Sequence, residues 1–385
     1  SLIHGHAYPK IVDAVIEQLR KGTAYTLATE IEVRYAEHLT ARSESLDKIR
    51  FTNSGTEAVM AMVKAARAFT GKHKIAKAEG SYNGTYDYIE VSQVSGPHNW
   101  GDINHPNRNA LAHGTPPSVL EDVIVYPFND VERTIRLLDE HADELGAVLI
   151  DPIPHRVGLF EATPEFVEAV YEWTRKHNAL MIFDEVITFR TNYGGAQEKY
   201  KVKPDLTALG KMIGGGFPVG AFAGRSDVMK VMDPNENPLL LPHSGTFSAN
   251  PITMTAGYVA MQDFDQNAVL KLNALAAQAR KQIEEAINLA DIPMSISGAG
   301  SMFRLHPRAQ TPTTYRGAFQ SGAEKAAMTK MLDHLFYKEN IIMVNTGTCM
   351  FSTVITQKEV DRLAEGLLNA FRAIRPELLK IQADA

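Results

Sequence analysis

Two short segments of the chain end in residues that can carry covalent chemistry. The apolar run from Met181 stops at the carboxylate of Asp184, and the run from Thr207 to Gly210 stops at Lys211. In an open α/β sheet, residues at the carboxyl ends of neighbouring strands lie where such sheets bind ligands. A lysine forms a Schiff base with an aldehyde, and a carboxylate pairs with the ring nitrogen of a pyridine cofactor. A pyridine-ring aldehyde is therefore one cofactor that needs the arrangement of these two segments.

A third segment has the composition of a phosphate-binding turn. Ser54, Gly55 and Thr56 follow a predicted strand at 48–52 and begin a predicted helix that runs to about Thr70. Unpaired N–H groups at a helix N-terminus attract anions, and a glycine lets the backbone approach the ligand closely. The same residues also suit an ordinary cap, in which a hydroxyl bonds the first helical turn. From this segment alone, the cap is the favoured interpretation.

Two further features support a cofactor site. Tyr82 follows a predicted strand at 74–78, and an aromatic side chain there can cover the face of a ring, although packing on the core is the favoured interpretation from this residue alone. A lone lysine after a strand is usually a surface charge, but Gly210 and 214–216 flank Lys211 and leave room for a bulky group. The phosphate turn, the tyrosine, the acid and the lysine each follow a strand of their own, and this combination is more specific than any one of them.

The elements that must position these residues alternate between strand and helix over about 45–260. Predicted strands cover 48–52, 74–78, 123–126, 147–150, 179–183 and 219–224. Since they are nearly all apolar and separated by helical patterns, they predict a mostly parallel sheet with helices on both faces. The strand at 219–224 follows Lys211 after too short a connection for a parallel crossover, so we expect it to be antiparallel. Residues 92–118 lack periodicity and are predicted to form a long loop.

The pattern changes after about residue 265. Helices are predicted at 267–289, 322–338 and 357–373, and strands at 302–305, 341–344 and 350–354. Helices at 8–22 and 29–41 precede the alternating region. The predicted organisation is an α/β protein in three parts, with N-terminal helices (1–44) that join a large domain (45–262) and a small α+β domain (263–385).

Composition limits the classes of partner. The chain has 385 residues and a net charge of -6, with Lys and Arg scattered along it, so nucleic acid and anionic membranes are not expected partners. No run of about 18 apolar residues predicts a membrane span, and no secretion signal is expected, so the predicted location is cytoplasmic. The single cysteine, Cys349, is expected to be a small buried side chain. No spacing of His, Asp or Glu predicts a metal site.

Five motifs together resemble a known family. They lie at 51–58, 183–186, 194–197, 204–216 and 243–251. With these motifs the chain resembles the class III aminotransferases of fold type I, which use pyridoxal 5'-phosphate (PLP). It is most similar to the glutamate-1-semialdehyde aminomutases and their β-amino-acid aminotransferase relatives. The resemblance implies a large domain with a mostly parallel seven-stranded sheet and a small C-terminal α+β domain.

The resemblance also implies two catalytic residues. Lys211 would hold PLP as a Schiff base and move a proton between the substrate carbon and the cofactor. Asp184 would pair with the pyridinium nitrogen and keep it protonated, so that the ring can accept electrons.

The remaining cofactor contacts are implied in the same way. Ser54, Gly55 and Thr56 would hold the phosphate. Tyr82 would stack on the ring, and Val186 would pack on its opposite face.

Thr246 would reach the phosphate bound by the neighbouring subunit, so a homodimer with its active site at the subunit interface is the implied assembly. The implied substrates are a small amine and an oxo acid.

The chain departs from the family pattern where substrates are bound. In relatives, a segment that precedes the point matching Ser1 contributes to the substrate pocket. The loop at 345–348 has neither the glutamate of the aminomutases nor the arginine of the β-amino-acid enzymes, and Asp151 replaces a glutamate. Arg156 is a candidate to bind a substrate carboxylate, with His155 beside it, although a surface arginine is an equal alternative.

The functional expectation is a ping-pong aminotransferase. It would move an amino group from an amine or β-amino acid to a 2-oxo acid, with pyridoxamine phosphate as the alternate cofactor form. The alternatives are a glutamate-1-semialdehyde-type 2,1-aminomutase and a PLP-binding homologue without turnover.

Overall fold

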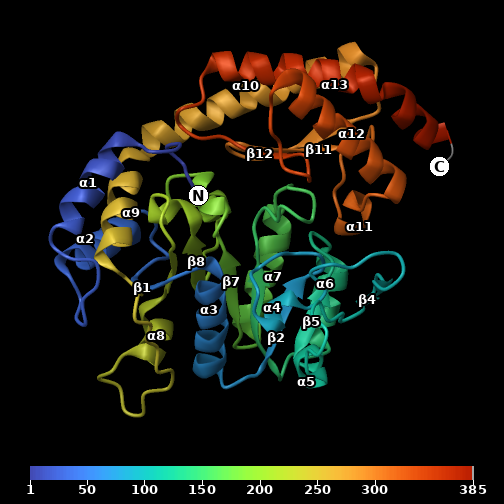
Figure 1. Cartoon of the computed structure of the whole chain (residues 1–385). Coiled ribbons are helices and arrows are strands. Elements are labelled where there is room, and N and C mark those ends of the chain that lie inside the picture. The colour runs from blue at the N-terminus through green and yellow to red at the C-terminus, as the bar shows by residue number, and fades with distance from the viewer. Residues whose placement is uncertain (384–385) are drawn as a thin grey trace. The chain divides into compact units, whose positions relative to one another are not determined.

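A computed structural model describes residues 1–383, which form two compact units (Figure 1). Unit 1 comprises Ser1–Pro152 and Ala162–Gln266, and unit 2 comprises Ile153–Glu161 and Asn267–Ala385. The short segment 153–161, which was predicted as part of the large domain, groups with the C-terminal residues. Residues 384 and 385, the end of the expected small domain, lie outside the described residues.

Unit 1 is built around a seven-stranded sheet with the order β1-β9-β8-β7-β6-β2-β5. Its strands are β1 (Lys48–Thr52), β2 (Lys74–Ala78), β5 (Val123–Tyr126), β6 (Leu145–Ile150), β7 (Leu180–Asp184), β8 (Leu206–Gly210) and β9 (Gly220–Gly224). Only β9 runs against its neighbours, β1 and β8, while the other adjacent pairs are parallel. The predicted mostly parallel sheet is confirmed, and so is the antiparallel strand after the lysine.

Helices cover both faces of this sheet (Figure 1). The helices of unit 1 are α1 (Pro9–Leu19), α2 (Glu30–Thr40), α3 (Gly55–Thr70), α4 (Asp87–Glu90), α5 (Pro117–Glu121), α6 (Val131–Asp139), α7 (Pro164–Lys176), α8 (Ser226–Met229) and α9 (Pro251–Asp263). The apolar side of α3 packs on one face, and Phe166 of α7 contacts Tyr126 on the other. The core of unit 1 is therefore divided into two apolar layers by the sheet.

Local sequence explains where the long helices begin. Ser54, Asp130 and Thr163 each accept a hydrogen bond from a backbone N–H in the first turn of the helix that follows. Pro164 occupies the first position of α7, where its missing N–H costs nothing. Gly71 ends α3 in the left-handed conformation with φ 69°.

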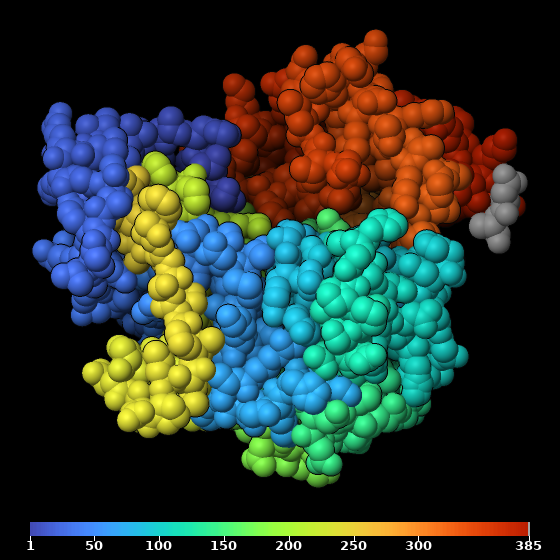
Figure 2. Space-filling model, turned by 60° about the horizontal axis from the view of Figure 1, so that its bottom comes forward, coloured from blue at the N-terminus to red at the C-terminus, as the bar shows by residue number. Residues whose placement is uncertain are grey.

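The N-terminal helices pack against α9, through an apolar cluster that includes Ile11 and Val15 of α1 and Ile252 of α9. Figure 2 shows the N-terminal residues in dark blue beside the yellow segment that leads into α9. The predicted loop at 92–118 contains a two-stranded hairpin, β3 (Gly101–Asp102) and β4 (His105–Pro106). Four 3-10 turns complete the unit: η1 (Thr188–Arg190), η2 (Ala196–Lys199), η3 (Lys211–Gly214) and η4 (Lys230–Met232).

Unit 2 has a three-stranded antiparallel sheet and four helices among the described residues. Its elements are α10 (Gln266–Ala290), β10 (Ser295–Ser297), β11 (Met302–His306), α11 (Tyr315–Ala318), α12 (Gly322–Glu339), β12 (Thr348–Met350) and α13 (Gln357–Ala383). The sheet order is β10-β11-β12, with β11 antiparallel to both neighbours. No helix within residues 1–383 is both long enough and apolar enough to span a membrane.

The sequence prediction was wrong for the strand at 341–344. This segment forms no strand, and the exposed fractions are 84% for Ile342 and 56% for Val344. Asn340 ends α12 with φ 53°, and the residues that pair with β11 come later, at Thr348–Met350. The strand predicted at 350–354 lies earlier, because Thr348–Met350 pair with β11.

Asp205 joins three strands of the large sheet at one end. Its carboxylate, 1% exposed, binds Arg175 of α7 and Arg225 after β9, and accepts a hydrogen bond of 2.8 Å from the backbone N–H of Met181. Because Asp205→Ala removes the shared acceptor of two arginines and of the Met181 N–H, it should lower the free energy of unfolding by about 1.5–3 kcal/mol, measured by urea denaturation. Asp227→Ala is the matched control, since Asp227 also binds Arg225 but is 53% exposed. We expect that control to lose less than about 1 kcal/mol, and equal losses would contradict the prediction.

Candidate active site

A cavity of about 220 Å³ lies in unit 1 where several strands of the sheet end. Its lining residues are Ser54, Gly55, Thr56, Tyr82, Asn83, Gly84, Asp151, Asp184, Val186, Ile187 and Lys211. The cavity therefore brings together every residue predicted to contact the cofactor except Thr246. It adds Asn83, Gly84 and Ile187, together with Asp151, which the sequence analysis names only as a departure from the family pattern.

Asp184 is the last residue of β7, and its carboxylate is buried. Asn83 Nδ2 donates a hydrogen bond of 2.9 Å to Oδ2, and the backbone N–H of Val186 donates one of 3.1 Å to Oδ1. Burial raises the pKa of the Asp184 carboxyl, whereas the two hydrogen bonds and the charge of Lys211 favour the ionised form. Within residues 1–383, no cationic side chain forms an ion pair with Asp184, so a protonated ring nitrogen would supply the missing positive partner.

Lys211 directly follows β8, which pairs in parallel with β7 and aligns Ala208 with Asp184. The lysine and the acid therefore come from the ends of neighbouring strands, as the sequence predicts. Lys211 adopts a left-handed conformation with φ 50°, which costs a non-glycine residue about 1–2 kcal/mol. Such strained residues concentrate at functional sites, because the surrounding structure must hold them in place.

The turn before α3 serves as a helix cap and also faces the cavity. Ser54 Oγ accepts a hydrogen bond of 3.1 Å from the N–H of Glu57, and the Glu57 carboxylate accepts one of 2.8 Å from the N–H of Asn53. Thr56 Oγ1 accepts a hydrogen bond of 3.2 Å from the N–H of Thr85. Because these oxygens act here as acceptors, the hydroxyl protons of Ser54 and Thr56 can still be donated to an anion.

Gly55 and Val186 meet across the cavity wall. A Cβ atom added to Gly55 would lie 2.9 Å from Cγ1 of Val186, closer than real Cβ contacts. The glycine thus lets the helix N-terminus approach Val186. An anion-binding helix end, a lysine, a buried acid and an aromatic side chain around one cavity fit the phosphate, aldehyde, ring nitrogen and ring of PLP.

The motif at 194–197 is bound by the side chain of Glu185. The buried Glu185 carboxylate accepts hydrogen bonds from the N–H groups of Ala196 and Gln197 and from the hydroxyl of Thr188. Burial raises the pKa of Glu185 to about 7, although these hydrogen bonds favour the charged form. The motif is therefore held against the chain directly after Asp184 and contributes no side chain to the cavity lining.

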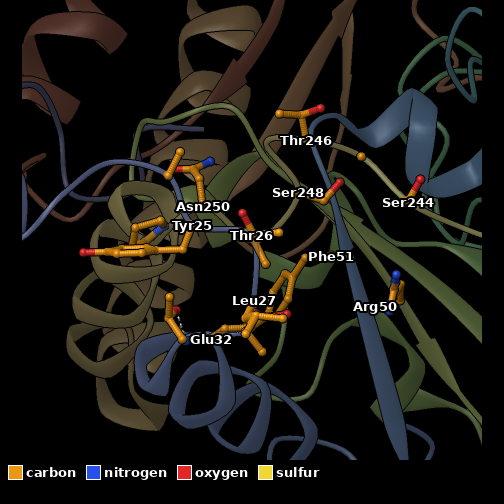
Figure 3. A pocket seen from close by; sticks show the side chains of 16 residues that line it. Tyr25, Thr26, Leu27, Glu32, Arg50, Phe51, Ser244, Thr246, Ser248 and Asn250 are labelled. Atoms are coloured by element: carbon orange, nitrogen blue, oxygen red, sulfur yellow. Dashed lines mark hydrogen bonds between the residues drawn. The ribbon is translucent and has the colours of Figure 1, made fainter.

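Thr246 lines a second cavity of unit 1, of about 690 Å³. Figure 3 shows Thr246 and Ser248 on one side of it, and Tyr25, Leu27 and Glu32 on the other. Thr246 is exposed and is absent from the lining of the Lys211 cavity. Within one chain, Thr246 and Lys211 thus belong to different cavities.

The two candidate substrate residues belong to unit 2. His155 and Arg156 lie in the segment 153–161, and Arg304 Nη1 donates a hydrogen bond of 2.6 Å to the carbonyl oxygen of His155. Arg304 thus binds backbone in its own unit. The role of His155 and Arg156 in substrate binding stays a prediction.

The chain is similar to known proteins over most of its length. A model of the family Aminotransferase class-III matches residues 1–314. The glutamate-1-semialdehyde 2,1-aminomutase of Methanothermobacter thermautotrophicus is 37% identical over 321 residues, which are 83% of this chain and 74% of that protein. An omega-transaminase from Sphaerobacter thermophilus has a TM-score of 0.94 and 44% identity, covering 97% of this chain and 85% of the other. A beta-phenylalanine aminotransferase from Variovorax paradoxus has a TM-score of 0.84 and 31% identity, over 95% and 80% of the two chains.

The contact between Gly55 and Val186 can be tested by one substitution and its rescue. Gly55→Ala places a methyl group against Val186, so it should raise the dissociation constant for PLP at least about tenfold, measured by absorbance titration of the cofactor-free protein. The double variant Gly55→Ala/Val186→Ala relieves the contact and should bind PLP more tightly than Gly55→Ala alone. Wild-type affinity in Gly55→Ala would show that this part of the cavity does not hold the cofactor.

Proposed function

The chain belongs to the class-III aminotransferases, and on that basis we propose that it transfers an amino group from an amine or a β-amino acid to a 2-oxo acid. The observation that carries the proposal is the shared cavity of Lys211, Asp184 and the turn before α3. The choice of transferase is supported by the omega-transaminase, whose 44% identity extends over 97% of the chain. The second candidate, a 2,1-aminomutase, is favoured by the aminomutase that is 37% identical over 83% of the chain.

PLP, the cofactor of this family, supplies a ring that accepts the electron pair left on the substrate carbon when a proton is removed. In the proposed site, Lys211 Nζ would hold the cofactor aldehyde and, after the substrate amine has taken its place there, would move that proton as a free amine. The Asp184 carboxylate keeps a proton on the ring nitrogen, and Asn83 and Val186 orient the carboxylate by their hydrogen bonds. The N–H groups at the start of α3, with the hydroxyls of Ser54 and Thr56, bind the phosphate. Tyr82 and Val186 hold the ring by its faces.

We also propose that the active enzyme is a homodimer in which Thr246 completes the partner's site. Thr246 and Lys211 line different cavities of one chain, which is the arrangement expected when a residue acts across an interface. The second cavity has exposed apolar residues on its rim, among them Tyr25 and Leu27, with exposed fractions of 50% and 83%. A partner subunit would cover these side chains.

A single-turnover experiment separates transferase from aminomutase. The PLP-loaded protein is mixed with one amino donor and no acceptor, using 1-phenylethylamine, a β-amino acid or glutamate-1-semialdehyde. The proposal predicts about one ketone released per site, with loss of the visible PLP absorbance. Lys211→Ala is the control and should release none.

The alternative outcomes have different meanings. Conversion of glutamate-1-semialdehyde to its amino isomer, with no ketone from any donor, would establish the aminomutase. If PLP is bound but its visible absorbance persists with every donor, the protein is a homologue without turnover.

The dimer proposal predicts complementation between two inactive variants. Thr246→Asp places a carboxylate near the partner's phosphate, and Lys211→Ala removes the amine. A purified heterodimer of the two, each chain with its own affinity tag, should regain about half of the wild-type activity, because one of its sites contains neither substitution. Activity no higher than in the parent homodimers would mean that Thr246 does not act across the interface.

A further inference from the structure

A lysine is fully buried inside the large sheet of unit 1. Lys77 lies in β2, between β6 and β5, and its exposed fraction is 0%. Interior parallel strands are usually apolar, and an isolated charge in such a position is costly. The cofactor site proposed above does not use this side chain. Its presence therefore needs a separate explanation.

The contacts of Lys77 are all with backbone. Its Nζ donates hydrogen bonds to the carbonyl oxygens of Ala78, Ser81 and Val91, at 3.3, 3.1 and 2.9 Å. An ammonium group has three N–H donors, so each has an acceptor. Burial lowers the pKa of Lys77 to about 7, and the carboxylate of Glu79 acts in the opposite direction. Since Ser81 and Val91 stand at the two ends of one loop, the lysine bridges those ends, next to a backbone hydrogen bond of 2.9 Å from the N–H of Gly80 to the carbonyl oxygen of Ser92.

This loop, residues 81–91, carries part of the cofactor cavity. Tyr82, Asn83 and Gly84 follow Ser81 directly and line the cavity. Asn83 is 3% exposed and donates its hydrogen bond of 2.9 Å to Asp184 Oδ2. Its other amide atom, Oδ1, is buried without a hydrogen-bond partner among residues 1–383. No network around the amide oxygen fixes Asn83, so its place depends on the backbone of the loop.

We propose that Lys77 is a positioning residue of the cofactor site, which ties Ser81 to Val91 and so holds Asn83 where it donates to Asp184. The inference rests on the proposed role of Asp184 toward PLP. It assigns Lys77 an effect on cofactor binding that passes through Asn83. If Lys77 only stabilised the sheet, its loss would act independently of Asn83.

A double-mutant cycle tests this dependence. The cofactor-free forms of Lys77→Met, Asn83→Ala and the double variant are titrated with PLP and followed by visible absorbance. Each single substitution should raise the dissociation constant about tenfold, as expected for one hydrogen bond to a charged group. The double variant should be no more than about twofold weaker than either single variant, because both remove the same bond to Asp184.

A second lysine of the same strand is the matched control. Lys74 binds Glu144 at 2.7 Å, away from the loop, so Lys74→Met should leave the PLP dissociation constant unchanged. Hydrogen exchange gives a readout that does not involve the cofactor. In Lys77→Met, amides of 81–91 should exchange faster than in wild type, while those of α3 keep their rates. If circular dichroism shows that Lys77→Met is unfolded, Lys77→Gln takes its place with the same criteria.

Three results would overturn the inference. One is wild-type affinity for PLP in the Lys77 variant. Another is multiplication of the two effects to about a hundredfold in the double variant, which would make the residues independent. The last is an unchanged exchange rate in the loop. Wild-type affinity for PLP in Asp184→Ala would instead remove the proposed role of Asp184, and this inference with it.

Discussion

The structure of the site depends on a buried carboxylate to which no cation is bonded among the described residues. Asp184 ends a strand in the interior of the sheet and is only 5% exposed, so water reaches its charge only through the cavity. Two N–H donors satisfy its oxygens, but hydrogen bonds alone do not balance a buried charge. Three features of the site surround this carboxylate. The parallel neighbour β8 is followed by Lys211, the loop after β2 carries the amide of Asn83, and the cavity is large enough for a pyridine ring.

The part of the fold that could be predicted was the part determined by local chemistry. The strands ending at Asp184 and Gly210 are short apolar runs bounded by polar or glycine residues, and helix caps such as Thr163 follow from hydroxyl chemistry. The failure at 341–344 has the same origin. A short apolar run meets the local criteria for a strand. A strand also needs a partner, however, and Thr348–Met350 already pairs with this edge of β11.

The charged and hydroxyl residues that line the cavity were singled out from the sequence, whereas no role was predicted for Lys77, whose hydrogen bonds are all with backbone. Lys77 looked like an ordinary polar residue in a strand, since its acceptors are three carbonyls that any sequence would provide. The amide of Asn83 gains meaning only when the fold brings it to Asp184, 101 positions away along the chain. Substrate choice was also beyond the sequence, because the candidate residues belong to a different unit from the cofactor cavity.

The place of β1 in the sheet determines when this strand can pair during synthesis of the protein. β1 is an edge strand whose one neighbour is β9, and the turn of Ser54–Thr56 follows it directly. When β1 leaves the ribosome, its partner has not yet been translated, and it stays unpaired until residues 220–224 emerge. The N-terminus of α3, which is proposed to bind the phosphate, is synthesised early. The strand that precedes it, β1, pairs only after β9 has been synthesised. The turn therefore gains its native support from the sheet only after about 170 further residues have been made.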